Sequence, residues 1–422
     1  MGNVKSGTAD SGDARTPRTR RFRSLDGLRG LAALVVVFHH ASLTLPAFSD
    51  LYLVAGTAPP RIGTALWWLT STPVQLLVAG PQAVFVFFVL SGFVLVLPVL
   101  NNTSFDWVAY YPRRLARLYL PAIASVALAA AWIQLANPNP ADASSRWVAG
   151  ASVAPHWRLI LSGSDLLFGD NSLNSPLWSL RWEVVFSLGL PLFAASALFT
   201  SRYWPFALIV SWGVVFVGMV AGNDTLALLP LFFAGSVLAV KVDAIHSWMA
   251  ARTRSVTPQI GGVILLAGCL ALLTVRWMVW TVMPDEQRLL TLADSLQFFG
   301  AVGLVSMAAF WAPFDRVLCA RPVQWLGRLS FSLYLVHVPV LIAVGAVIGR
   351  DHAVLTGIVS LAVSLVTAEL FFLAIERPSH KFSRHIGIAA AQMVTGGLGE
   401  RANARVLHEL AAGAGARQTV ER

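Results

Sequence analysis

Long apolar stretches separated by short polar segments dominate the pattern of this chain. A helix needs about 20 mainly apolar residues to cross the hydrocarbon core of a bilayer. Ten segments approach that length: residues 28–47, 76–98, 117–136, 176–199, 203–221, 225–241, 259–281, 290–312, 329–348 and 353–376. The split between the fifth and sixth rests on the short sequence AGNDT, so about eight to eleven spans stay open. The pattern predicts an all-α, polytopic transmembrane helix bundle of about ten spans.

Composition supports a membrane protein, because 56% of the residues are hydrophobic, only 12% are charged and the mean hydropathy is +0.66. Soluble chains carry roughly 25% charged residues. The two cysteines, Cys269 in an apolar segment and Cys319 in a basic one, predict no disulfide framework. The first apolar stretch is interrupted by His39 and His40, which argues against a cleaved signal peptide.

The net charge of +10 comes from basic residues that cluster between the apolar segments. They form no basic face with interleaved aromatic residues, so we expect no nucleic-acid partner. Most of the 31 Lys and Arg residues fall on the side of residue 1 when the spans alternate, which predicts a multi-pass protein of the cytoplasmic membrane with both termini inside. We expect a disordered basic tail at 1–21, a membrane domain at 22–380 and a partly disordered cytoplasmic tail at 381–422.

The first span carries an arginine near its start and two histidines near its end. The eleven-residue step from Arg29 to His40 amounts to three turns plus about 20°, so both lie on one stripe, about 16 Å apart along the axis. Asp26 lies near Arg29 on that stripe, whereas His39 points about 100° away. An inner anchor and a buried neutral imidazole are the structural alternatives, but ionisable groups inside a bundle are functional candidates. Adjacent helical histidines diverge, so no metal site is expected.

The sequence YPRRLARLYLP places Arg113, Arg114 and Arg117 at the inner entrance of the third span. Arginines at such a position can simply anchor the helix on the inner side. Guanidinium groups also suit bidentate binding of phosphate, and Arg114 and Arg117 share one helix face. Ser91 and Gly92 form a small-residue step in the second span, where a neighbouring helix or an extended ligand can approach closely. We expect these five residues to form the binding site of a phosphate-bearing donor molecule that enters from the cytoplasmic side.

Two later segments supply candidates for the acceptor side and for proton transfer. In NSPLWSLRWEVVF, counting from the outer surface puts Glu183 about two turns into the fourth span, at a depth comparable with His40. Trp178 and Ser179 precede it, although an aromatic belt explains tryptophan there equally well. Tyr334 and His337 lie along one face of the ninth span, where His337 is a second acid or base, an acceptor ligand or a packed core histidine. Glu369 and Glu376 in the last span are expected to pair internally at the inner rim.

A deep histidine and a glutamate on neighbouring helices can act as a general base and its orienting partner. Inner arginines add phosphate recognition. This combination suits the transfer of a group from a charged cytoplasmic carrier to a hydroxyl. An acyl group carried as a coenzyme A thioester is the natural candidate, because the thioester is already activated and needs no metal. A proton-coupled transporter or glycan flippase, with His40, Glu183 and His337 as a proton relay, is the rival from another class. A second enzymatic rival is a different membrane O-acyltransferase architecture, whose catalytic histidine lies late in the chain.

The motifs also resemble those of the bacterial acyltransferase-3 family of integral membrane O-acyltransferases. The resemblance extends over about residues 22–380 and rests on LDGLRGLAALVVVFHH, FFVLSGFVL, RRLARLYLP, LWSLRWE and GRLSFSLYLVHVPV. It implies ten spans and transfer of acetyl or another short acyl group from acyl-CoA, with no permanently bound cofactor. The implied acceptors are hydroxyls of envelope glycans, lipids or antibiotic sugars.

By this resemblance, Arg29 and His40 occupy the essential arginine and histidine positions of the family. Arg114 and Arg117 match its paired arginines near the acyl-CoA, and Glu183 matches its glutamate. The chain departs from the family in having VVF after Glu183, where Phe-Tyr is frequent, and we expect no fused esterase-like domain at its C-terminus. The sequence therefore predicts a membrane O-acyltransferase with His40 as general base, Glu183 as its orienter and Arg29 near the donor.

Overall fold

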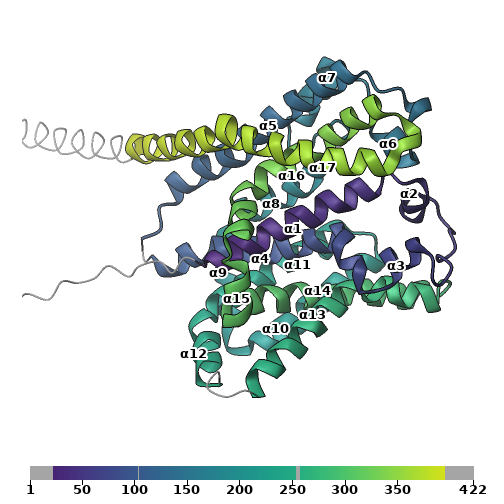
Figure 1. Ribbon diagram of the computed structural model, residues 1–422. Coiled ribbons are helices and arrows are strands. Elements are labelled where there is room, and N and C mark those ends of the chain that lie inside the picture. Colours follow the sequence, from purple (N-terminus) through teal and green to yellow (C-terminus); the bar gives the residue numbers. More distant parts are fainter. Residues whose placement is uncertain (1–21, 103, 253–256, 395–422) are drawn as a thin grey trace, which may run out of the picture.

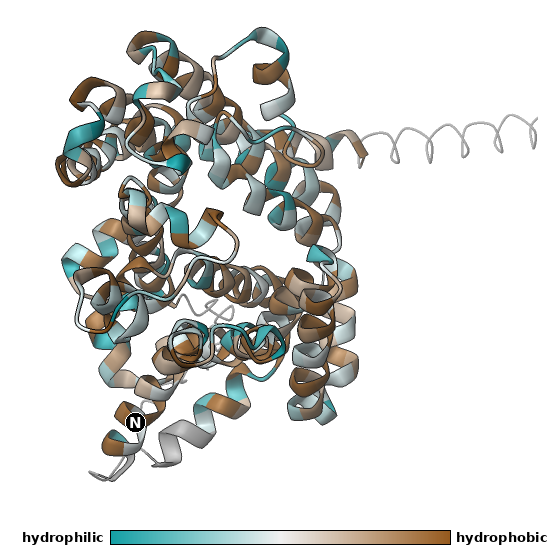
Figure 2. Cartoon of the chain, turned by 90° about the vertical axis from the view of Figure 1, so that its right-hand side faces the viewer, coloured by the Kyte–Doolittle hydropathy of each residue, from teal (hydrophilic) through white to brown (hydrophobic). Residues whose placement is uncertain are grey.

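The computed structural model describes residues 22–102, 104–252 and 257–394. The tail predicted for 1–21 lies outside these residues, as does most of the tail predicted for 381–422, although 381–394 continues as helix. Within the described part every regular element is helical, which confirms the predicted all-α bundle (Figure 1). Hydrophobic residues predominate along the helices (Figure 2), as expected for a polytopic membrane protein.

Long helices build the bundle and short ones connect them. The long helices are α1 (Arg23–Ser42), α4 (Gly80–Asn101), α5 (Trp107–Ala136), α10 (Trp204–Val220), α11 (Asp224–Val240), α13 (Thr257–Val282), α14 (Gln287–Phe310), α16 (Arg321–Ile348) and α17 (Ala353–Phe371). The shorter α-helices are α2 (Pro46–Leu53), α3 (Ala65–Ser71), α6 (Arg146–Ala151), α7 (Trp157–Gly163), α8 (Trp178–Leu188), α9 (Leu190–Phe199), α12 (Val242–Arg252) and α15 (Ala312–Leu318). The 3-10 turns are η1 (Pro73–Val78), η2 (Pro140–Asp142), η3 (Ser175–Leu177), η4 (Thr200–Tyr203) and η5 (Arg350–His352), and η6 (Phe372–Glu376) is a π-helical turn.

The expected ten spans are reproduced only in part. By length and composition, seven helices within the described residues could cross a membrane, or up to eight if the bent pair α1–α2 forms one span. The predicted span 225–241 is α11, which has only 17 residues. The predicted span 176–199 is divided into α8 and α9, and α9 continues through η4 into α10 over Leu190–Val220.

The two described ends of the chain lie on the same side of the bundle. In Figure 1, the start of α1 and the helix that ends at residue 394 both lie at the left, whereas α2, α3 and α6 lie at the right. This arrangement agrees with an even number of crossings. The assignment of that side to the cytoplasm stays a prediction from the distribution of Lys and Arg.

Local sequence signals explain where several helices begin and end. Asp106 caps α5 by accepting a hydrogen bond from the backbone N–H of Ala109 at 2.9 Å, and Asn223 caps α11 in the same way. Proline lies in the first turn of α4, α9, α10 and α16, where its missing N–H costs nothing. Asn137 ends α5 in the left-handed conformation, with φ of 44°.

Helices α1 and α16 run parallel and in direct backbone contact. A Cβ atom on Gly30 would lie 2.3 Å from the backbone nitrogen of Gly327, and one on Gly327 would lie 2.3 Å from the carbonyl oxygen of Asp26. Glycine permits this close approach because it has no side chain. Ten residues further along each helix, His40 and His337 meet, with Nδ1 and Nε2 3.2 Å apart. These two contacts fix the direction and the register of the pair.

The segment before α8 enters the bundle instead of staying at its rim. Asn174 is fully buried, and its Nδ2 donates to Ser125 Oγ at 3.1 Å and to the carbonyl oxygen of Leu335 at 2.9 Å. Pro339 lies four residues after Leu335 within α16 and has no N–H to offer that carbonyl. Asn174 therefore supplies the hydrogen bond that proline removes, and this ties the start of α8 to the inside of the bundle.

Two hydrophobic clusters hold the helices together. One combines residues of α4, α11 and α14, and it includes Leu25 and Leu28 of α1. The other combines residues of α5, α8 and α16, and it includes Ala33 and Val37 of α1. Because α1 contributes to both, it lies at the boundary between the two halves of the bundle.

The glycine contact between α1 and α16 makes a prediction about stability. We expect Gly327→Ala to lower the apparent melting temperature of the protein in detergent, because the new methyl group must push two backbones apart at a cost of about 1–3 kcal/mol. Gly345→Ala on the same helix is the matched control, since its Cβ would meet Thr356 only at 3.5 Å. Equal melting temperatures for the two variants would refute the close contact.

Candidate active site

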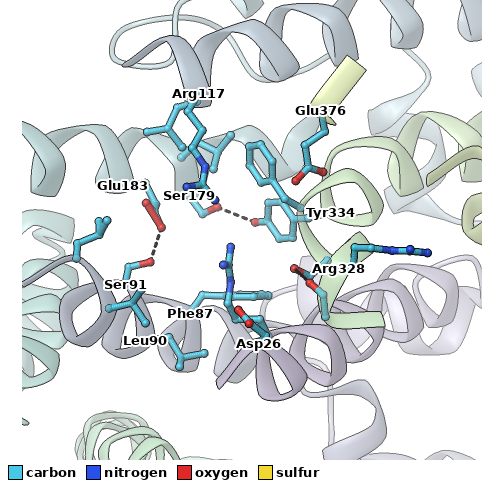
Figure 3. Close-up of a pocket in the computed structure, with 18 of the residues that line it drawn as sticks. Asp26, Phe87, Leu90, Ser91, Arg117, Ser179, Glu183, Arg328, Tyr334 and Glu376 are labelled. Carbon is cyan, nitrogen blue, oxygen red and sulfur yellow. Dashed lines mark hydrogen bonds between the residues drawn. The ribbon is translucent and has the colours of Figure 1, made fainter. Parts of the chain in front are cut away.

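A polar cavity of about 390 Å³ lies on the side of the bundle where both described ends are found. Its walls come from α1, α4, α5, α8, α16 and the last helix, segments far apart in the sequence (Figure 3). The polar side chains that line it are Asp26, Arg29, Ser91, Arg114, Arg117, Ser179, Glu183, Gln324, Arg328, Ser330, Tyr334, Glu376 and His380. Four arginines and three carboxylates line the cavity, and one of the arginines, Arg328, is paired with Glu369 beside it.

A buried ion pair forms one wall of the cavity. Arg114 Nη2 donates to Glu183 Oε2 at 2.5 Å, and the two side chains are only 12% and 17% exposed. Ser91 Oγ donates to the other carboxylate oxygen of Glu183 (Figure 3). Arg114 Nε donates to Ser187 Oγ at 3.0 Å. Each carboxylate oxygen of Glu183 therefore has a partner, and Arg114 is held in one orientation.

Two further arginines in the cavity remain available for an anion. Among the described residues, neither Arg29 nor Arg117 has a salt bridge or a hydrogen-bonded partner for its guanidinium group. Glu376, at the end of the π-helical turn, interacts electrostatically with both of them, and it accepts a hydrogen bond from Ser332 Oγ at 2.5 Å. Two guanidinium groups whose N–H donors are not taken up by a carboxylate, beside a paired third one, can hold a phosphate group through charge-assisted hydrogen bonds.

Ser179 and Tyr334 lie together at another wall of the cavity. Their hydroxyl oxygens are 2.7 Å apart, and the Tyr334 hydroxyl also donates to the carbonyl oxygen of Pro176 at 3.0 Å (Figure 3). Both side chains are buried. Tyr334 also contacts the second polar centre, because its own carbonyl oxygen lies 2.8 Å from His337 Nδ1.

The second polar centre contains His40 and His337 and lies outside the cavity. The ring centroids of the two histidines are 4.9 Å apart, and the ring of Trp147 lies 5.4 Å from that of His40. His40 Nδ1 is 2.9 Å from the carbonyl oxygen of Val36. His39 points away from this pair, as predicted, and its Nδ1 lies 2.9 Å from the carbonyl oxygen of Val78. Its contacts account for it as a packed core residue.

The expected pairing of Glu183 with His40 is not found. His39, next to His40, packs against Gly80 at the first residue of α4, whereas Glu183 contacts Ser91, eleven residues further along α4. At 1.5 Å per residue, these eleven residues place Glu183 about 16 Å from the two histidines along the axis of α4, toward the side where the described ends of the chain lie. The sequence estimate placed both at one depth because it counted the fourth span from the outer surface. The segment around Asn174 instead enters the bundle, so α8 begins well inside it.

Three other predicted residues also lie outside the cavity. Gly92 faces α11, where an added Cβ would lie 2.0 Å from the carbonyl oxygen of Phe232, so close helix packing explains it. Arg113 is exposed and does not line the cavity, although its i, i+4 spacing places it on the same side of α5 as Arg117. Trp178 is 40% exposed. Among the described residues there is no group of three or more His, Cys, Asp or Glu side chains placed to hold a metal ion.

Two residues that shape the site are not among those predicted for it from the sequence. Asn174 has only a local signal in the sequence, because asparagine followed by Ser-Pro is typical of a turn at a helix entry. Glu376 was expected to pair internally at the inner rim, but it also lines the cavity. Glu369 does pair internally, since Arg328 Nη2 donates to its Oε1 at 3.1 Å and Trp325 Nε1 to its Oε2 at 2.9 Å.

The chain matches a family model over residues 22–372, which covers all of the helices that line the cavity up to Phe372. The model is that of the acyltransferase-3 group and is described as an acyltransferase domain. The chain belongs to the acyltransferase-3 family. This confirms the resemblance found in the sequence, and with it the prediction of an enzyme of the acyltransferase class.

Curated relatives of this acyltransferase-3 protein come from bacteria and from a fungus. Peptidoglycan O-acetyltransferase OatA of Listeria monocytogenes is 23% identical over 86% of the chain and 57% of its own length. O-acetyltransferase PaAT-1 of Phomopsis amygdali is 26% identical over 79% of the chain and 75% of its own length. Acyltransferase MdmB of Streptomyces mycarofaciens is 32% identical over 42% of the chain and 40% of its own length.

The chain therefore spans little more than half the length of the Listeria relative. No solved structure matches it significantly.

The burial of the pair of Arg114 and Glu183 leads to a prediction about stability, for which the more exposed pair of Arg328 and Glu369 is the control. We expect Glu183→Ala to destabilise the fold by about 3–5 kcal/mol, because it leaves the Arg114 charge buried without a counterion. Glu369→Ala removes the partner of Arg328, whose side chain is 50% exposed, and should cost at most about 1 kcal/mol. Unfolding of both variants in detergent tests the difference. Similar losses would show that the pair of Arg114 and Glu183 is solvated.

Proposed function

We propose that this acyltransferase-3 protein is an O-acyltransferase of the cytoplasmic membrane. It transfers a short acyl group, acetyl in the first instance, from acyl-CoA to a hydroxyl of a sugar in an envelope polysaccharide, a glycolipid or a secreted metabolite. The observation that carries the proposal is the cavity with two arginines that have no hydrogen-bonded partner among the described residues, connected through Tyr334 to a histidine pair. Relatives named as O-acetyltransferases support acetyl as the group transferred.

The donor is proposed to bind with its phosphates in the cavity. Arg29 and Arg117 contact the phosphates, and Arg114, held by Glu183, completes a positively charged surface. In coenzyme A an extended pantetheine arm separates the phosphates from the thioester. A base about 16 Å along α1 from Arg29 is the arrangement that such an elongated donor requires. The enzyme needs no bound cofactor in this proposal, because the thioester is already activated.

His40 is proposed to act as the general base. Its Nε2 takes the proton from the acceptor hydroxyl while the oxygen attacks the thioester carbonyl. The carbon–sulfur bond breaks, the acyl group becomes an ester of the acceptor, and the sulfur leaves as the coenzyme A thiolate. The imidazolium then returns the proton to that sulfur, so that free coenzyme A is released and His40 is neutral again.

Glu183 has a different role in this mechanism from the one expected from the sequence. Its carboxylate binds Arg114 and Ser91, so it orients the donor site and not the base. The same geometry weakens the case for a proton-coupled transporter. A relay from His40 to Glu183 would have to cross about 16 Å, and the observed contacts of Glu183 lead to Arg114 instead.

The donor site can be tested without knowing the acceptor. We expect Arg29→Ala and Arg117→Ala each to weaken acetyl-CoA binding by about tenfold or more, because each removes a charge-assisted contact to phosphate. Calorimetric titration of the purified protein in detergent measures this. Binding of S-acetylpantetheine, which lacks the nucleotide phosphates, should not change.

Arg202→Ala is the matched control for this titration. Arg202 lies in η4, outside the cavity, with its guanidinium over the Tyr203 ring. Its replacement should leave acetyl-CoA binding intact. The donor assignment fails if Arg29→Ala and Arg117→Ala bind acetyl-CoA as the unmodified protein does, or if all three variants lose affinity equally.

The base can be tested separately from the donor site. We expect His40→Ala to reduce acetyl transfer by about 10²- to 10⁴-fold without changing the affinity for acetyl-CoA. Transfer is measured with membranes containing the protein and radiolabelled acetyl-CoA, by counting the label in glycan and lipid fractions. His39→Asn, whose amide can still donate to Val78, should retain activity. Full transfer by a well-inserted His40→Ala protein would rule out the mechanism.

A further inference from the structure

His337 is 1% exposed and does not line the cavity described above. Its Nδ1 lies 3.1 Å from the carbonyl oxygen of Leu333 and 2.8 Å from that of Tyr334. Carbonyl oxygens only accept hydrogen bonds, so Nδ1 must carry the proton. In the neutral ring the other nitrogen, Nε2, then holds a lone pair.

That lone pair faces His40. The Nδ1 of His40 lies 3.2 Å from His337 Nε2 and 2.9 Å from the carbonyl oxygen of Val36. Both neighbours are acceptors, so the proton of neutral His40 resides on Nδ1 and is shared between them. The tautomer of His40 is thereby determined, and its basic nitrogen is Nε2. This is the nitrogen that a general base at this position has to present.

We propose that His337 is the positioning residue of the base, in the place where the sequence suggested Glu183. It accepts the Nδ1–H of His40, fixes the ring and its tautomer, and stabilises the imidazolium that forms when Nε2 takes a proton. The proposal rests on the proposed function, because it assigns His337 a role in the step carried out by His40. His337 itself does not touch the substrate.

A neutral acceptor suits this location better than a carboxylate. Burying an ionised carboxylate without compensating partners is far more costly than burying a hydrogen-bonded imidazole. The titratable groups near the pair are His39 on α1 and Tyr334 on α16. No Asp or Glu of the described residues forms a recorded ion pair or hydrogen bond with either histidine. The bundle thus supplies only neutral orienting groups: one imidazole and the helix carbonyls.

The backbone keeps the two rings in register. Gly30 and Gly327 bring α1 and α16 into contact ten residues before His40 and His337 respectively. Since both helices rise at the same rate, the rings arrive at the same level. Close to His337, α16 is also held in place by the hydrogen bond from Asn174 Nδ2 to the carbonyl oxygen of Leu335.

Two substitutions at one position separate orientation from packing. His337→Leu fills space but has no acceptor, whereas His337→Gln carries an amide oxygen at about the reach of Nε2. We expect His337→Leu to lower the transfer rate at saturating acetyl-CoA by about 10²-fold, with the half-saturating donor concentration unchanged. We expect His337→Gln to recover most of that rate. His352→Leu, at an exposed position in η5, is the control.

The outcomes distinguish this inference from the proposed function. If His40→Ala abolishes transfer but a folded His337→Leu retains the full rate, His337 does not position the base. If His337→Gln is as impaired as His337→Leu while both melt like the unmodified protein, the residue acts through something other than its acceptor nitrogen, and the inference is wrong. If His40→Ala itself keeps full transfer, the proposed function fails first.

Discussion

The backbone contact of α1 with α16 at Gly30 and Gly327 is the constraint on which both polar centres depend. Nothing larger than hydrogen fits there, since a Cβ on either residue would lie 2.3 Å from the other helix. The contact allows the helices to run parallel without drifting apart. Near the described ends of the chain, the pair exposes Arg29 to the cavity, and further along it brings His40 against His337. A displacement at the contact would therefore move both centres, which no side-chain interaction within either centre could compensate.

The two centres reduce the cost of burying polar groups in different ways. The cavity combines cations with carboxylates, and Arg114 and Glu183 compensate each other there. The second polar centre contains neutral imidazole rings. Their N–H groups donate to helix carbonyl oxygens, each of which has a second lone pair that can accept a hydrogen bond. This difference matches the chemistry proposed for each. An anionic donor needs fixed positive charge, whereas a base must be able to remain neutral until the acceptor hydroxyl arrives.

Helical periodicity in the sequence was sufficient to predict the helix bundle, the shared stripe of Arg29 and His40, and the divergence of His39. Periodicity defines the direction in which a side chain points but not its depth in the bundle. The depth of Glu183 depends on Asn174, which enters the bundle because Pro339, 165 residues later, leaves a carbonyl without a donor. Such a long-range exchange has no local signature, and so the expected partner of His40 was wrong. The span count is affected by the same cause, since α8 begins inside the bundle and cannot cross it alone.

The separation of the centres also determines how substitutions combine. Groups more than about 10 Å apart that share no partner usually contribute additively to free energies. Arg117 lines the cavity and His40 does not, and within the described residues no hydrogen bond or ion pair joins the two side chains or links them through a shared partner. Tyr334 and the glycine contact are different, since each belongs to both centres: the Tyr334 hydroxyl binds Ser179 at the cavity while its carbonyl accepts from His337. Substitutions of a side chain that belongs to one centre should therefore have additive effects on donor binding and proton transfer. Substitutions that move the backbone of α1 or α16 should affect both.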